Sequence, residues 1–191
     1  MKNISTSLLL LALFTTLIAG KCRKEKTLLE QLPPETQTGT NTFGCLVNGQ
    51  VFKPGGALLT GGSLTSNYQY LNTGINGGYY FRLSGVKGSG NNQTSVGLFT
   101  DSLKIQEGLK YLLDSSEKGK VYAHYSNLTN GPTQNEWFYE TKKINFGGEL
   151  WIKKLDTINQ IVSGTFWFDA VNANGQKVEV REGRFDVHYT R

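Results

Sequence analysis

The sequence predicts an all-β fold, an antiparallel β-sandwich of about ten short strands, with a lipocalin-like β-barrel as the alternative. Three observations support this prediction. Apolar and polar residues alternate with a period of two over much of the chain, which is typical of strands with one buried face. Glycine is frequent, with 23 copies, and it clusters between the alternating segments, where turns and bulges need it. No segment shows the periodicity of a long amphipathic helix.

The first 21 residues have the pattern of a secretory signal peptide. Lys2 precedes an apolar block of about a dozen residues, and the small residues Ala19 and Gly20 follow that block. A membrane-spanning helix needs about 20 apolar residues, so the block fits a signal better than a permanent span. We therefore assign residues 1–21 to a signal peptide.

Cys22 is the predicted site of lipid attachment. Residues 18–20, Ile-Ala-Gly, match the aliphatic and small residues that precede the lipidated cysteine of bacterial lipoproteins, although Lys21 separates them from Cys22. The alternative is cleavage directly before Lys21, which would give a soluble periplasmic or secreted protein. In that case Cys22 could form a disulfide with Cys45 in an oxidising compartment.

Residues 22–41 are predicted to form the lipidated N-terminus and a flexible tether. This segment mixes charges with a Pro33-Pro34 pair and a threonine-rich stretch, and it has little apolar periodicity. Residues 42–191 follow as a single all-β domain, long enough to bury a core.

One phrase in the sequence resembles a known group of proteins. From Leu32 onward the chain reads LPPETQTGTNTFGCLVNG, which resembles the opening of an uncharacterised family of Bacteroidetes lipoproteins. The resemblance extends through GGELWIKKLD, VSGTFWFDA and EGRFDVHY. It implies a lipid-anchored protein of the cell envelope, in the outer membrane, without an established activity, and it supplies no catalytic residues.

The strand pattern predicts turns and core residues in the domain. Asn48-Gly49 lies between two apolar segments and has the residue types of a type I′ hairpin turn. Cys45 is predicted to be a buried apolar residue of the first strand. Alternation is clearest near the C-terminus, where it predicts these inward-facing residues: Phe166, Phe168, Ala170, Val178, Val180, Phe185, Val187 and Tyr189.

Charge and motifs exclude several classes of function. Loss of Lys2 and Lys21 with the signal leaves 18 basic and 15 acidic residues, scattered along the chain, so no nucleic-acid partner is expected. The sequence lacks HExxH, GxSxG, P-loop and paired CxxC motifs, and we predict no catalytic residue, metal or cofactor. Arg184, Asp186 and His188 share one strand face, and we expect that face to be the solvated side of an outer strand.

Aromatic residues are the candidate binding residues. Trp137, Tyr139, Trp151 and Trp167 alternate with predicted core residues, and aromatic faces can stack on sugar rings or form a protein contact. Trp151 and Trp167 lie opposite the predicted core face, which would place them on the outer surface of a two-layer sandwich. If the faces are reversed, they are core residues instead.

Two positions are candidates for O-glycosylation. Ser102 and Thr157 each follow an aspartate and precede an aliphatic residue, the pattern that Bacteroidetes use on exported proteins. Both are also good turn residues.

These observations predict a cell-envelope lipoprotein that acts as a non-enzymatic binding or interaction module. Its partners would be the membrane, through the lipid anchor, and a glycan or a protein. Two alternatives are a tethered or secreted hydrolase acting on glycans and a lipocalin-like carrier of an apolar ligand.

Cys22→Ala tests the anchor. Intact-mass measurement of protein from native membranes should show a mature chain that begins at Cys22 and carries diacylglycerol. The variant should lose that mass because it lacks the acceptor thiol. A native chain that begins at Lys21 without lipid would contradict the prediction.

Overall fold

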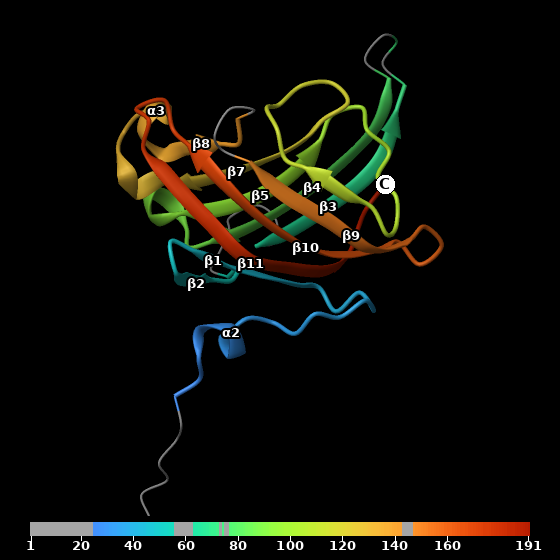
Figure 1. The fold of residues 1–191 in the computed structure, drawn as a ribbon, viewed down its shortest axis with the longest axis horizontal. Coiled ribbons are helices and arrows are strands. Elements are labelled where there is room, and N and C mark those ends of the chain that lie inside the picture. The colour runs from blue at the N-terminus through green and yellow to red at the C-terminus, as the bar shows by residue number, and fades with distance from the viewer. Residues whose placement is uncertain (1–24, 56–62, 73, 75–76, 143–146) are drawn as a thin grey trace, which may run out of the picture.

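The computed structural model describes residues 25–55, 63–72, 74, 77–142 and 147–191, and these residues hold eleven strands (Figure 1). The prediction of an all-β sandwich is confirmed, and the sheet does not close into the alternative barrel. The strands are β1 (Thr42–Val47), β2 (Gln50–Phe52), β3 (Leu64–Leu71), β4 (Gly78–Lys87), β5 (Thr94–Thr100), β6 (Lys110–Leu112), β7 (Val121–Asn127), β8 (Phe138–Glu140), β9 (Gly148–Asp156), β10 (Ile161–Val171) and β11 (Lys177–His188).

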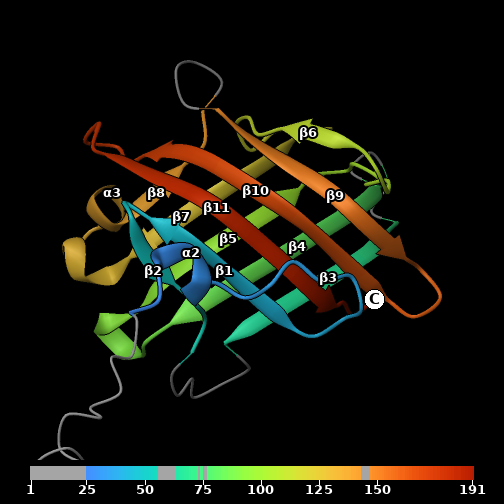
Figure 2. The same ribbon diagram turned by 60° about the horizontal axis from the view of Figure 1, so that its bottom comes forward.

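The strands form two layers that face each other across the core (Figure 2). One layer has the order β2-β1-β11-β10-β9-β6, and the other has the order β8-β7-β5-β4-β3. All of the pairings between these strands are antiparallel. Among the named strands the layers join where Val171 of β10 pairs with Glu140 of β8, and isolated bridges from Asn67 to Thr190 and from Leu113 to Val121 link them elsewhere.

The helices are short. α2 (Leu28–Gln31) precedes the first strand and α3 (Gln134–Trp137) precedes β8, while η2 (Gly90–Asn92) and η3 (Leu128–Asn130) are 3₁₀ turns. A capping box opens α2, in which Thr27 and Glu30 each satisfy the backbone N–H of the other. No helix in the described part of the chain is long and apolar enough to cross a membrane.

The predicted core and turn are confirmed. The eight residues predicted to face inward near the C-terminus are all buried, as is Cys45 in β1. Asn48 and Gly49 connect β1 to β2 with φ angles of 48° and 76°, as a type I′ turn requires. Phe166 stacks on Phe168 with ring centroids 6.3 Å apart, which shows how closely the inner face is packed.

A β-bulge in β11 changes which residues face the core. Phe166 pairs with Gly183 and Phe168 pairs with Val180, so Arg181 and Glu182 together lie opposite Trp167. Glu182 adopts a φ of 55° at this point. The extra residue shifts the alternation of the strand by one position. The residues that face the core therefore have even numbers before the bulge, such as Val178 and Val180, and odd numbers after it, such as Phe185 and Val187.

Residues 33–41, which belong to the predicted tether, lie against β1 and β11 in the structure (Figure 2). A Cβ atom at Gly44 of β1 would approach Pro33 Cδ to 2.6 Å, so glycine permits this close contact. At the other end of the segment, Asn41 Oδ1 accepts a hydrogen bond of 2.9 Å from the backbone N–H of His188. We call residues 33–41 the N-terminal strap.

Asp186 holds the strap in place, and this corrects the expectation that the Arg184, Asp186 and His188 face is solvated. The side chain of Asp186 is only 1% exposed. Its carboxylate accepts hydrogen bonds from Thr36 Oγ1 (2.6 Å), Thr38 N (3.0 Å), Gly39 N (2.7 Å), and both the N–H (3.2 Å) and the hydroxyl (2.9 Å) of Thr40. Only His188 of the predicted row is exposed.

The hydrogen bonds to Asp186 also keep it ionised. Burial by itself would raise its pKa, but the bonds from Thr36, Gly39, Thr38 and Thr40 outweigh burial, and the pKa lies below its ordinary value. A carboxyl group whose pKa is lowered on folding stabilises the native state above its unfolded pKa, about 3.9. That contribution is lost as the pH falls through the lower folded value.

Asp186→Asn should therefore destabilise the fold at neutral pH. The amide replaces an acceptor oxygen with a donor that faces other donors, so we expect a loss of about 2–3 kcal/mol in the free energy of unfolding at pH 7. The difference from the native protein should shrink as the pH falls below about 4, since the unfolded carboxyl group then binds a proton while the native carboxylate is still ionised, and it should be lost once the pH has fallen through the lower folded pKa.

Urea unfolding at pH 7 and pH 3 measures both effects. Glu35→Gln is the control, because its ion pair with Lys153 lies near the surface and should contribute less than about 1 kcal/mol. Equal stability of native protein and Asp186→Asn at pH 7 would show that the strap does not depend on this carboxylate.

Candidate functional site

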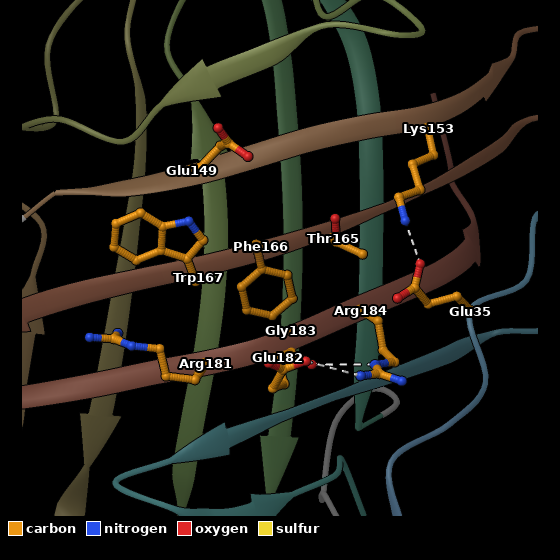
Figure 3. A pocket seen from close by; sticks show the side chains of 10 residues that line it. All are labelled: Glu35, Glu149, Lys153, Thr165, Phe166, Trp167, Arg181, Glu182, Gly183 and Arg184. Carbon is orange, nitrogen blue, oxygen red and sulfur yellow. Dashed lines mark hydrogen bonds and ion pairs between the residues drawn. The ribbon is translucent and has the colours of Figure 1, made fainter. Parts of the chain in front are cut away.

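The outer face of β9, β10 and β11 carries a shallow depression of about 400 Å³ (Figure 3). Trp167 lines it from the outer face of β10, next to the buried residue Phe166, and charged side chains complete the lining. Trp151 lies on the same outer face, one strand away. We call the surface formed by Glu149, Trp151, Lys153, Thr165, Trp167 and Arg181 the tryptophan platform.

Strand alternation builds the platform. In β9, the buried residues Leu150 and Ile152 alternate with Glu149, Trp151 and Lys153, which face outward. In β10, Phe166 and Phe168 face the core while Thr165 and Trp167 face outward. The register pairs Thr165 with Trp151 and Trp167 with Glu149, so the two tryptophans are diagonal neighbours across adjacent strands.

Cations flank both tryptophan rings. Lys153 Nζ and Lys110 Nζ lie 4.7 Å and 5.1 Å from the ring of Trp151, which is half-buried. The guanidinium of Arg181 lies 5.4 Å from the ring of Trp167, which is 43% exposed. The β-bulge places Arg181 opposite Trp167, so the bulge sets this contact. Trp167 therefore offers more free ring surface than Trp151 does.

Opposite charges around the depression are paired. Glu149 forms an ion pair of 2.9 Å with Lys110, and Glu182 forms one of 3.5 Å with Arg184. Glu35, from the N-terminal strap, forms an ion pair with Lys153 (Figure 3). The lining of the depression holds three carboxylates and three cations, so its formal charge is zero.

The carboxylate of Asp169 holds the Arg181 side chain in position. Its carboxylate lies 2.6 Å from Arg181 and 3.0 Å from Lys177. Burial opposes ionisation of Asp169, but the hydrogen bonds from Lys177 and Arg181 outweigh it, and its pKa is lowered. Arg181 is thus held next to Trp167 by a partly buried partner.

The indole N–H of Trp151 adds one unsatisfied group. Trp151 Nε1 is buried and has no hydrogen-bond partner among the described residues. A buried donor without an acceptor is uncommon in folded proteins.

The other two predicted aromatics lie elsewhere. Trp137 ends α3 and is half-buried against the edge of Phe138, with ring centroids 6.1 Å apart. Tyr139 is buried in the core next to Tyr125, and its hydroxyl accepts a hydrogen bond of 3.0 Å from Asn130 Nδ2. The structure therefore brings together Trp151 and Trp167 and leaves Trp137 and Tyr139 in the opposite layer.

The predicted modification sites are also apart from the platform. Ser102 is half-buried with a φ of 53°, and its hydroxyl donates a hydrogen bond of 3.0 Å to Gly77 O. Thr157 is exposed on the turn between β9 and β10. Cys22 lies outside the described residues. Within the described part of the chain, no group of three His, Cys, Asp or Glu residues is placed to hold a metal ion.

Sequence reasoning missed the charged residues of the platform. Lys153 lies two residues after Trp151, so strand alternation could have placed it on the same face. For Arg181 and Glu35, no sequence pattern indicated that they would lie on this face. Arg181 reaches Trp167 only because of the bulge, and Glu35 reaches Lys153 only because the strap is held against the sheet.

The fold and the site define an antiparallel β-sandwich that presents tryptophans and paired charges on one outer face. A family model described as "Domain of unknown function (DUF6252)" matches residues 81–187, more than half of the chain, so the chain belongs to this family. The matched region includes both platform tryptophans and Asp186. No curated protein and no solved structure gives a match.

The two platform tryptophans should differ in their effect on stability. Trp167→Ala should change the free energy of unfolding by less than about 1 kcal/mol, because the ring is largely exposed. Trp151→Ala should cost about 2 kcal/mol or more, since it removes a half-buried ring and two cation–π contacts. Urea unfolding of both variants makes the comparison. A larger loss for Trp167→Ala would mean that Trp167 is primarily a packing residue.

Proposed function

We propose that this protein is a cell-envelope lipoprotein whose β-sandwich binds a neutral glycan through the tryptophan platform. The observation that supports the proposal most strongly is the exposure of Trp167, 43%, in the middle of a well-packed strand. A large apolar ring that is left exposed among fixed polar groups is typical of a binding surface.

The chemistry of the platform suits a sugar. One face of a pyranose ring presents C–H groups that pack on an indole ring, while its hydroxyls need hydrogen-bond partners at the edge. Glu149, Lys153, Thr165 and Arg181 provide such partners around the tryptophans. Because the charges lining the depression balance, a neutral ligand is favoured over an anion or a cation.

The proposed anchor would keep the platform close to the membrane. Only five residues separate Cys22 from Leu28 at the start of α2, which makes six Cα-to-Cα steps. At about 3.3–3.6 Å per extended residue, they can span roughly 20 Å at most. Glu35 of the strap also forms part of the depression, so the segment nearest the anchor belongs to the binding surface. The resemblance to Bacteroidetes lipoproteins favours the outer membrane as the location.

The three carboxylates that line the depression raise the question of glycan hydrolysis. Each of them, Glu35, Glu149 and Glu182, has a basic partner within ion-pair distance. Each carboxylate is thus engaged by a neighbouring cation, whereas a glycosidase must present one carboxyl group to the glycosidic oxygen as its acid. The platform therefore supports binding better than catalysis.

Affinity electrophoresis in gels that contain neutral polysaccharides tests the proposal. The native protein should be retarded by at least one member of a panel of glucans, xylans and mannans. Trp167→Ala should abolish the retardation, because the stacking surface is lost, and we expect affinity to fall about tenfold or more.

Trp137→Ala is the matched control, since Trp137 is a surface tryptophan on the opposite layer and should not affect binding. Retardation that survives Trp167→Ala, or that is absent with every neutral polysaccharide, would overturn the proposal. Release of reducing ends from a bound polysaccharide would instead favour the hydrolase alternative.

A further inference from the structure

A second depression, of about 600 Å³, lies at the end of the sandwich where β3 and β4 meet the β9–β10 turn and the residues after β11. Tyrosine side chains from both layers line it, and two basic residues complete the lining. We call it the tyrosine cleft and define it by Tyr68, Tyr70, Tyr79, Tyr189, Lys104 and Arg191. It shares no lining residue with the depression beside the tryptophan platform.

The tyrosines form a continuous aromatic wall. Tyr68 contacts Tyr189 across the two layers with ring centroids 5.6 Å apart, and it contacts Tyr79 at 5.5 Å. Tyr79 in turn contacts Tyr70 at 5.2 Å. Tyr68 and Tyr189 are buried, whereas Tyr70 at the rim is 58% exposed. The cleft therefore has a fixed aromatic base and an exposed ring at its mouth.

The hydroxyl groups of the two buried tyrosines, Tyr68 and Tyr189, remain protonated. Burial is the main cause that raises the pKa of Tyr68 and also that of Tyr189. Both groups therefore keep their protons at physiological pH, and the Tyr68 hydroxyl donates its proton to the carbonyl oxygen of Ile105 at 3.5 Å.

The charges of the cleft differ from those of the platform. The side chains of its lining include two cations, those of Lys104 and Arg191, and no carboxylate. Lys104 Nζ lies 5.4 Å from the ring of Tyr79 and forms no ion pair within the described residues. Arg191 donates a hydrogen bond to the carbonyl of Thr157 on the opposite rim.

Asp156 is the carboxylate closest in sequence to the residues that line the cleft, and its oxygens already accept hydrogen bonds within its own turn. Asp156 Oδ1 accepts hydrogen bonds of 2.9 Å from the backbone N–H groups of Ile158 and Asn159. Its second oxygen accepts one of 2.8 Å from Asn159 Nδ2. Asp156 is therefore bonded within its own turn and forms no ion pair with Lys104, although its charge acts on Tyr189 of the cleft and helps to raise the pKa of that tyrosine.

From this combination of aromatic wall, phenolic hydroxyls and unbalanced positive charge, we infer that the tyrosine cleft binds an acidic sugar residue, with the carboxylate next to Lys104 and Arg191. The pyranose ring would pack against Tyr70 and Tyr79, and the hydroxyls of the sugar would meet the tyrosine hydroxyls. The inference uses residues outside the tryptophan platform and does not depend on the proposed function.

Saturation-transfer NMR titrations of the mature chain with sodium glucuronate test this inference. Glucuronate should bind saturably, and methyl β-glucoside, which lacks the carboxylate, should bind about tenfold more weakly, because a charge-assisted hydrogen bond is lost. Lys104→Gln should weaken glucuronate binding by a similar factor. Raising the salt concentration should weaken it further, since the cations are near the surface.

Two variants separate this cleft from the platform. Tyr70→Ala should weaken glucuronate binding, and Trp167→Ala should leave it unchanged. Loss of binding in Trp167→Ala with no loss in Lys104→Gln would place the acidic sugar on the platform and overturn the inference. Equal affinity for glucuronate and the glucoside, absence of glucuronate binding, or equal competition by inorganic phosphate would overturn it as well.

Discussion

The arrangement of the N-terminal strap depends on the carboxylate of Asp186. A buried ionised carboxyl group is costly unless hydrogen bonds satisfy it, and donors from Thr36, Thr38, Gly39 and Thr40 do so. The requirement works in both directions, because the buried backbone N–H of Gly39 would otherwise lack a partner. The same contacts lead the chain into β1 and bring Glu35 beside the platform. A segment with the composition of a linker is thereby made part of the domain.

The β-bulge in β11 is the second constraint. A strand with strict alternation cannot bury both Val180 and Phe185, since they are five residues apart and would face opposite sides. The bulge inserts one residue, restores burial on both sides and turns Arg181 toward Trp167. The same bulge therefore sets both the core packing and the outer face. The residue it inserts keeps Val180 and Phe185 buried, and it also places Arg181 next to the exposed indole of Trp167.

The two surfaces differ in charge although both are aromatic. Around the tryptophan platform each acid has a basic partner, so the surface combines apolar rings with fixed, balanced polar groups. In the tyrosine cleft the acids are absent from the lining, and Lys104 and Arg191 leave a positive field. Aromatic rings provide area with little loss of side-chain entropy, and the neighbouring charges decide which ligand is preferred. Under the two proposals, one sandwich would distinguish neutral from acidic sugars at separate places.

The sequence by itself determined the all-β fold class, the inward residues Phe166, Phe168 and Phe185, and the Asn48-Gly49 turn, because these follow from local periodicity and turn chemistry. It left open whether Trp151 and Trp167 face outward or belong to the core, and the structure decided that they face outward. The tertiary structure decided which segments that are distant in sequence come into contact, because local patterns do not specify those contacts. It buried Asp186 under a segment 146 to 150 residues away in sequence, and it assembled the tyrosine cleft from both layers. It also separated Tyr139 from the tryptophans. Such contacts depend on which strands become neighbours and on a single inserted residue in β11, and no periodicity within one segment carries that information.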